Sequence, residues 1–91
     1  MKKIWNETAW EEYLFWQNQD RKTLRKINKL INEIERSGSK SIGHAEQLKG
    51  DLKGWSSVNI DKKNRLVYRI SGKDENKYLE ILQCKTHYEK I

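Results

Sequence analysis

Residues 64–71 read Asn64-Arg65-Leu66-Val67-Tyr68-Arg69-Ile70-Ser71, and this stretch decides the fold of the 91-residue chain. Leu66, Tyr68 and Ile70 alternate with a second set of side chains that includes Arg65 and Arg69. A period of two predicts a half-buried strand at the centre of a sheet, with its apolar set facing the core. Arginine on a rigid strand can hold a phosphate through a planar fork of donors. The second face is therefore either a working surface or a solvated outer face.

Strands and helices are predicted on both sides of this strand. Residues 2–5 indicate a short first strand, and Asn6 is a suitable N-cap for a first helix. The aromatic residues of this helix are predicted to lie against the sheet and to serve as core or partner surface. Asp20 caps a second helix that ends at Gly38, and its apolar residues recur at steps of three and four. These residues are Leu24, Ile27, Leu30, Ile31 and Ile34.

The remaining segments complete an α+β fold. Residues 45–50 are too short for a full helix, although one helical turn there would present Glu46 and Lys49 on the same side. Residues 55–60 and 78–85 predict two further strands, and the polar turns before and after residues 64–71 join the three into a meander. We therefore expect a small antiparallel sheet, built from the N-terminal strand and this three-strand meander, with two N-terminal helices packed on it. The whole chain, 1–91, is predicted to be one domain.

Composition limits the function classes. Nineteen Lys and Arg against thirteen Asp and Glu give a net charge of +6, which favours a polyanionic partner such as nucleic acid. The basic face of the second helix is either a nucleic-acid surface or a solvated face.

The single cysteine, Cys84, excludes an internal disulfide and is predicted to be a small core residue. With no apolar run long enough for a membrane span and no export signal, a cytoplasmic location is expected.

The inventory of reactive groups points to metal-free chemistry. Two histidines and one cysteine have no metal-ligand spacing, and no glycine-rich phosphate loop or nucleophile elbow is present. We therefore predict no metal and no cofactor. A carboxylate (Glu46), a histidine (His87), a tyrosine (Tyr88) and the strand arginines suit cleavage of RNA by its own 2′-hydroxyl. That reaction needs a base, a cation at the phosphate and an acid for the departing 5′-oxygen.

Five segments together resemble one known family. They are Trp10-Glu11-Glu12-Tyr13-Leu14-Phe15-Trp16-Gln17, Lys26-Ile27-Asn28-Lys29-Leu30-Ile31, Glu46-Gln47-Leu48-Lys49, Asn64-Arg65-Leu66-Val67-Tyr68 and His87-Tyr88. In this order they are similar to the Txe/YoeB family of toxins, in the RelE-like superfamily. The resemblance implies a RelE-like fold and a toxin that cuts mRNA in the ribosomal A site. It also implies an antitoxin of the YefM/Axe type and a toxin homodimer.

The resemblance also assigns roles by position. Glu46 is similar to the family's general base, Arg65 to its phosphate-stabilising arginine, His87 to its general acid and Tyr88 to the tyrosine that orients the substrate. The predicted RNA-binding residues are Lys49, Trp55, Asn59 and Arg69.

Two departures from the family pattern affect this site. Val58-Asn59-Ile60 stands where many members carry an Arg-Arg pair, so Asn59 replaces an active-site arginine and reduces positive charge at the phosphate. The chain also continues past Tyr88 with Glu89-Lys90-Ile91.

Two functions are consistent with these observations. The first is a ribosome-dependent mRNA endonuclease toxin with mRNA and the ribosome as partners and no membrane association. The second is a non-catalytic basic module that binds RNA or the ribosome and blocks translation by occupancy. The products separate them, because cleavage leaves a new 5′-hydroxyl end and occupancy leaves the message whole.

Overall fold

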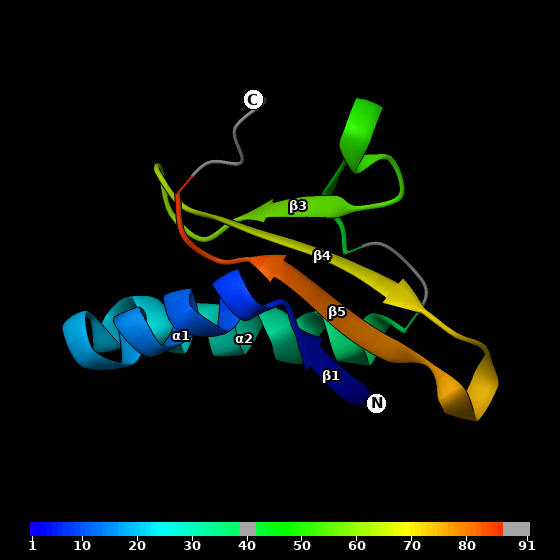
Figure 1. Cartoon of the computed structure of the whole chain (residues 1–91), viewed down its shortest axis with the longest axis horizontal. Coiled ribbons are helices and arrows are strands. Elements are labelled where there is room, and N and C mark those ends of the chain that lie inside the picture. Colours follow the sequence, from blue (N-terminus) through cyan, green and yellow to red (C-terminus); the bar gives the residue numbers. More distant parts are fainter. Residues whose placement is uncertain (39–41, 87–91) are drawn as a thin grey trace.

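A computed structural model describes residues 1–38 and 42–86 and shows two helices on one side of a five-stranded sheet (Figure 1). The sheet order is β1-β5-β4-β3-β2. In chain order the elements are β1 (Lys2–Trp5), α1 (Glu7–Gln19), α2 (Arg21–Ser37), β2 (Glu46–Gln47), η1 (Gly50–Leu52), β3 (Ser56–Asn59), β4 (Arg65–Ser71), η2 (Asp74–Asn76) and β5 (Tyr78–Gln83). The α+β class and the central position of residues 65–71 are confirmed.

The predicted helix ends are confirmed by their caps. The Asn6 side chain accepts a hydrogen bond from the Thr8 N–H at 3.0 Å, and Asp20 accepts from the N–H groups of Lys22 and Thr23. Each cap satisfies backbone donors that the first turn of a helix leaves unpaired. Gly38 ends α2 at φ 65°, a left-handed conformation that glycine adopts without strain.

The core lies between the helices and one face of the sheet. From α2 it takes Ile27, Leu30, Ile31 and Ile34 of the predicted stripe, with Leu24 partly buried against them. From the sheet it takes Val58, Leu66, Tyr68, Leu79 and Ile81, and Ile60 directly after β3. Cys84 is fully buried in the same cluster, as predicted. The face of β4 that carries Leu66 and Tyr68 is therefore the core face.

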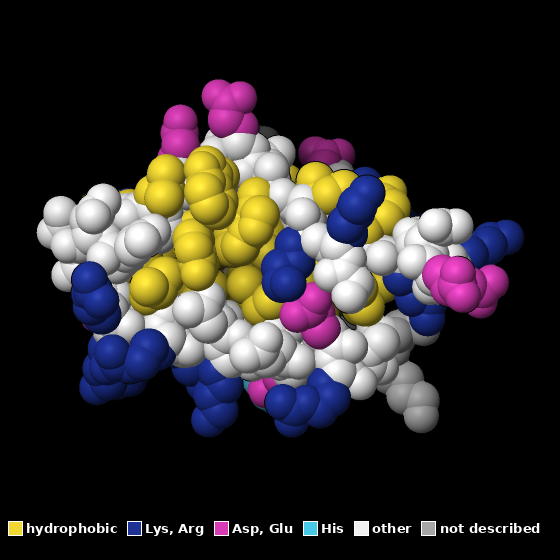
Figure 2. All heavy atoms as spheres, turned by 90° about the horizontal axis from the view of Figure 1, so that it is seen from below, with side chains coloured by type: hydrophobic (Ala, Val, Ile, Leu, Met, Phe, Trp, Pro, Cys, Tyr) yellow, Lys and Arg dark blue, Asp and Glu magenta, His cyan; other side chains and the backbone are white. Residues whose placement is uncertain are grey.

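The aromatic residues of α1 divide between the core and the surface. Ala9 and Trp16 are the buried residues of the helix, whereas Trp10, Leu14 and Phe15 are exposed. Figure 2 looks onto the helix side and shows hydrophobic side chains gathered there, bordered by Lys and Arg. The prediction that these aromatics lie against the sheet is therefore wrong for Trp10 and Phe15, because a helix on a flat sheet buries only one stripe.

The sheet is mixed rather than antiparallel, which corrects the predicted strand pairing. β1 runs parallel to β5, with Lys2 opposite Tyr78 and Trp5 opposite Ile81. Side-chain alternation indicates which face of a strand is buried but carries no information on strand direction. The direction follows from the path of the chain, which leaves β1 through two helices and re-enters the sheet at its opposite edge.

The helical turn considered for residues 45–50 does not form. Residues 46–47 form the edge strand β2, which pairs antiparallel with Ser56 and Ser57, and the Leu48 N–H donates to the Trp55 carbonyl at 2.9 Å. Ladder hydrogen bonds to β3 outweigh the helical preference of so short a segment, since an isolated turn is costly to nucleate. Across residues 1–38 and 42–86, no helix has the length and apolar character needed to cross a membrane.

Candidate functional site

Strand register places four of the predicted site residues on one face of the sheet. Glu46 lies opposite Ser57, Asn59 opposite Arg65, and Arg69 opposite Glu80. Directly opposed residues of antiparallel strands point to the same side. Since the neighbouring residues of β4 face the core, these side chains lie on the face turned away from α1 and α2. We call this surface, with Glu46, Asn59, Arg65 and Arg69, the candidate face.

Arg65 is a half-buried cation on this face. Its Nε is buried and has no hydrogen-bond partner within the described ranges. A buried donor without an acceptor costs about 1–3 kcal/mol, so such a group calls for an explanation. Asn59, opposite it on β3, is exposed and supplies no charge. Among the described residues, Arg65 therefore has an unpaired donor just beneath the predicted phosphate-binding surface.

Arg69 is held differently. Its Nε donates to Glu80 at 2.7 Å, and its guanidinium lies 4.3 Å from the centre of the Trp55 ring. Ser71 donates to the same carboxylate at 3.0 Å. The hydrogen bond from Arg69 is the largest influence on Glu80 and lowers the pKa of its carboxyl. Arg69 is thus tied to a carboxylate and to an aromatic ring, and fixes Trp55 at the edge of the candidate face.

Glu46 and Lys49 are both exposed at the β2 edge of the sheet. Glu46 is extended in β2, and Lys49 directly precedes η1, so the side-by-side placement on one helical turn does not occur. Solvent reaches both groups, and Glu46 remains on the same face as Arg65.

The segment before the predicted acid is anchored at both ends. The Cys84 N–H donates to Glu12 at 2.7 Å, and the Trp16 indole donates to the Cys84 carbonyl at 2.8 Å. Two residues later, the Arg65 N–H donates to the Thr86 carbonyl at 3.1 Å. Residues 65 and 86, far apart in sequence, are therefore in direct contact. His87 and Tyr88 lie outside the described residues.

Burial of Glu12 gives the first testable prediction. Desolvation raises the pKa of its carboxyl above the ordinary 4.5, opposed by the hydrogen bond from Cys84. A raised pKa means that the folded state binds this proton more tightly than the unfolded state, so protonation stabilises the fold. That stability is present below the ordinary pKa and is lost as the pH rises through the raised value. Glu12→Gln keeps an acceptor for Cys84 without the charge.

We therefore expect the free energy of unfolding of Glu12→Gln, relative to wild type, to increase as the pH rises above 4.5. Denaturant unfolding of both proteins at a series of pH values measures this difference, and groups common to both cancel. A difference that stays constant across the series would show that Glu12 has the same pKa folded and unfolded.

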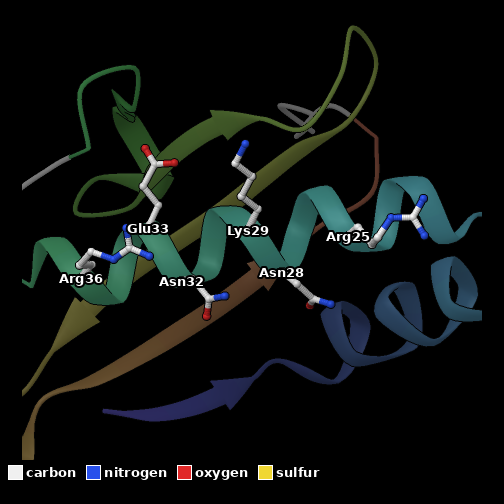
Figure 3. A pocket seen from close by; sticks show the side chains of 6 residues that line it. All are labelled: Arg25, Asn28, Lys29, Asn32, Glu33 and Arg36. Carbon is white, nitrogen blue, oxygen red and sulfur yellow. The ribbon is translucent and has the colours of Figure 1, made fainter.

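A second charged surface runs along α2 on the helix side of the sheet. Its basic residues are Arg21, Lys22, Arg25, Lys26, Lys29 and Arg36. All six are exposed, and within the described part of the chain none of them forms a salt bridge. Arg25, Lys29 and Arg36 line a pocket on this helix together with Asn28, Asn32 and the acidic Glu33. Figure 3 shows the three cations following one another along α2, with Glu33 between Lys29 and Arg36. We call these six residues the α2 basic surface.

Comparison with known proteins agrees with this architecture. The family described as "YoeB-like toxin of bacterial type II toxin-antitoxin system" matches residues 5–88. Toxin YoeB of Mycobacterium bovis is 48% identical over 80 residues, which are 88% of this chain and 89% of that protein.

Solved structures show the same likeness. A YoeB/ParE toxin from Agrobacterium tumefaciens matches with a TM-score of 0.90 and 41% identity, covering 97% of this chain and 100% of that one. YoeB from Staphylococcus aureus, solved in a heterotetrameric complex with YefM, matches with a TM-score of 0.81 and 37% identity, covering 97% and 98%. The same staphylococcal toxin has also been solved as a dimer. The fold, the order of its elements and a family match over nearly the whole chain identify this protein as a YoeB-like toxin of a bacterial type II toxin–antitoxin system.

Proposed function

We propose that this toxin is a metal-independent endoribonuclease that cleaves mRNA in the ribosomal A site. The observation that carries the proposal is the position of Arg65. Its buried Nε has no partner in the described ranges, Glu46 lies on the same sheet face, and its backbone bonds to Thr86, the residue before His87. A base, a cation and an acid are the three groups that cleavage by a 2′-hydroxyl requires.

In the proposed reaction Glu46 removes the proton of the 2′-hydroxyl, whose oxygen then attacks the neighbouring phosphorus. The bond from phosphorus to the 5′-oxygen breaks, leaving a 2′,3′-cyclic phosphate upstream. Arg65 stabilises the negative charge that grows on the phosphoryl oxygens, because its planar guanidinium can donate to two of them at once. His87 protonates the departing 5′-oxygen, and Tyr88 orients the scissile nucleotide.

The remaining predicted residues bind the message around this centre. Trp55, fixed by Arg69, presents a ring on which a base can stack, an interaction worth about 1–3 kcal/mol per base. Lys49 and Asn59 are exposed near Glu46 and Arg65 and would contact the backbone and sugar. Reverse transcription across the message, with and without ribosomes, tests the activity. Stops at the A-site codon that need ribosomes would support it.

We also propose that the α2 basic surface contributes to ribosome binding, since ribosomal RNA presents a dense array of phosphates. The triple variant Arg25→Glu, Lys29→Glu and Arg36→Glu is expected to bind ribosomes more weakly. The slope of log affinity against log salt should fall by about 2–3, one unit or slightly less for each lost phosphate contact.

Lys2→Glu, Lys53→Glu and Lys73→Glu together form a matched control, because all three lysines are exposed and the change in net charge is the same. Sedimentation with ribosomes at several salt concentrations measures both variants. Equal loss in the two would assign the effect to net charge and remove the α2 basic surface from the interface.

The occupancy alternative gains support from the same surface, because the exposed cations of α2 suit ribosome binding whether or not the message is cut. For its partners, we propose that this chain, like the staphylococcal YoeB solved with YefM and as a dimer, binds a YefM-like antitoxin and a second copy of itself. Trp10, Leu14 and Phe15 on α1 supply exposed apolar area for such contacts.

A further inference from the structure

Thr86, the last residue that the structure describes, has an unusual backbone. Its φ is 60°, in the left-handed region that β-branched residues rarely adopt. The side chain is exposed, so its packing does not explain the conformation. Strained backbone of this kind persists where surrounding contacts determine it and is common near functional sites. The contacts made by Thr86 therefore indicate what the turn is for.

Both backbone polar groups of Thr86 are bonded to the start of β4. Its N–H donates to Asn64 Oδ1 at 2.5 Å, and its carbonyl accepts from the Arg65 N–H at 3.1 Å. The Gln83 side chain donates to the same carbonyl at 3.4 Å. Asn64 thus binds the N–H of Thr86 and Arg65 binds its carbonyl, and together they fix Thr86 beside Arg65.

The Asn64 side chain is itself held in place by hydrogen bonds. It is buried, and its Nδ2 donates to both carboxylate oxygens of Asp61, at 3.1 and 3.0 Å. Asp61 Oδ1 also accepts from the N–H groups of Lys63 and Asn64, at 2.8 and 2.7 Å. In the β3–β4 turn the side-chain oxygen Oδ1 of Asn64 is therefore directed at Thr86, and the side chain cannot rotate away without losing the two hydrogen bonds to Asp61.

We propose that Asn64 is a positioning residue for the catalytic end of the chain. By holding Thr86 in its left-handed turn against Arg65, it fixes the point from which the chain continues to His87 and Tyr88. This inference rests on the proposed function, in which those residues act together with Arg65. Asn64 does not touch the substrate and acts through the residues that follow Thr86.

The first experiment uses Asn64→Ala. Misplacement of a catalytic group by about 1 Å can lower a rate about 10²-fold, so we expect a loss of about 10- to 10²-fold in single-turnover cleavage on programmed ribosomes. Ribosome affinity should be unchanged. Exchanging the pair, Asp61→Asn with Asn64→Asp, reverses the side-chain hydrogen bond between the two residues but keeps a side-chain oxygen at 61 for the turn N–H groups and one at 64 for the Thr86 N–H. This exchange should restore most of the rate.

A second pair of variants avoids the buried position. Thr86→Pro removes the N–H and fixes φ near −65°, so it should lower the rate as Asn64→Ala does. Thr86→Gly adopts positive φ without strain and should keep most of the activity. Because residue 86 is exposed, both proteins are expected to fold. Equal activity of the Pro and Gly variants would overturn the proposal.

The double-mutant test shows whether Asn64 acts through His87. In a His87→Gln background, Asn64→Ala should cause no further loss, because residues that act as a unit are not additive. A full additional loss would mean that Asn64 contributes by another route and would overturn the inference.

Amide exchange supplies a readout that does not depend on cleavage. The Thr86 N–H should be protected in wild type and exposed in Asn64→Ala, and protection retained in Asn64→Ala would also overturn it.

These readouts separate the two proposals. If the wild-type protein did not cleave mRNA, the proposed function would fail, whereas the exchange of the Thr86 amide would still test whether Asn64 holds the turn.

Discussion

The single-turnover rate of mRNA cleavage is expected to fall about 10²- to 10³-fold when Arg65 is replaced by lysine, the loss typical of removing one preorganised donor at a developing oxyanion. Lysine keeps the positive charge but lacks the planar fork that meets two phosphoryl oxygens at once. Asn59, directly opposite on β3, supplies no second cation to compensate. Ribosome affinity should change little, because a single phosphate contact contributes only a small part of the binding.

Arg69→Lys is the matched control for this prediction. Arg69 lies on the same strand and face, but its guanidinium is already paired with Glu80. A lysine there keeps the ion pair, which at a partly exposed position contributes about 0–1 kcal/mol, and loses the packing of the guanidinium on Trp55, which touches no proposed reacting group. We therefore expect a much smaller loss of rate than in Arg65→Lys. An Arg65→Lys enzyme as fast as wild type would remove Arg65 from the role of phosphate ligand.

The second large effect concerns the proposed base and acid. Glu46→Gln and His87→Gln should each lower the single-turnover rate about 10²- to 10⁴-fold, the range that general acid–base catalysis supplies. Both proteins should still sediment with ribosomes, because neither residue lies on the α2 basic surface.

Glu75→Gln controls for the loss of one carboxylate, since Glu75 is exposed in η2, in the turn between β4 and β5. Its rate should equal that of wild type. If Glu46→Gln behaved like Glu75→Gln, another group would be the base and the assignment of Glu46 would be wrong.

Local sequence signals predicted the elements whose side chains carry a clear period. The alternation in residues 64–71 and the apolar stripe of α2 gave the central strand and the long helix, both confirmed. Side-chain periodicity carries no information on strand direction, so the parallel pairing of β1 with β5 was not predicted. The edge strand β2 is two residues long, too short for any periodic signal.

The candidate site residues were likewise predictable from the sequence, whereas the contacts that hold them were not. Resemblance to the toxin family named Glu46 and Arg65, and strand register then placed them on one face. Contacts between residues distant in sequence left no local signal. The Arg69–Glu80 pair and the bond from Thr86 to Asn64 join residues 11 and 22 positions apart. The spacing of Asp61 and Asn64 is a turn signal, and it gave no hint that Asn64 also holds Thr86.

One measurement tests the central claim most directly. An end-labelled message is placed on ribosomes with a defined A-site codon, and the toxin is added in excess over the ribosomes. We predict a single cut in that codon, a downstream fragment with a 5′-hydroxyl that polynucleotide kinase can label, and no cut when the nucleotide before the scissile bond is 2′-deoxy. Translation that stops while the labelled message remains full length would contradict the account and identify a protein that inhibits by occupancy.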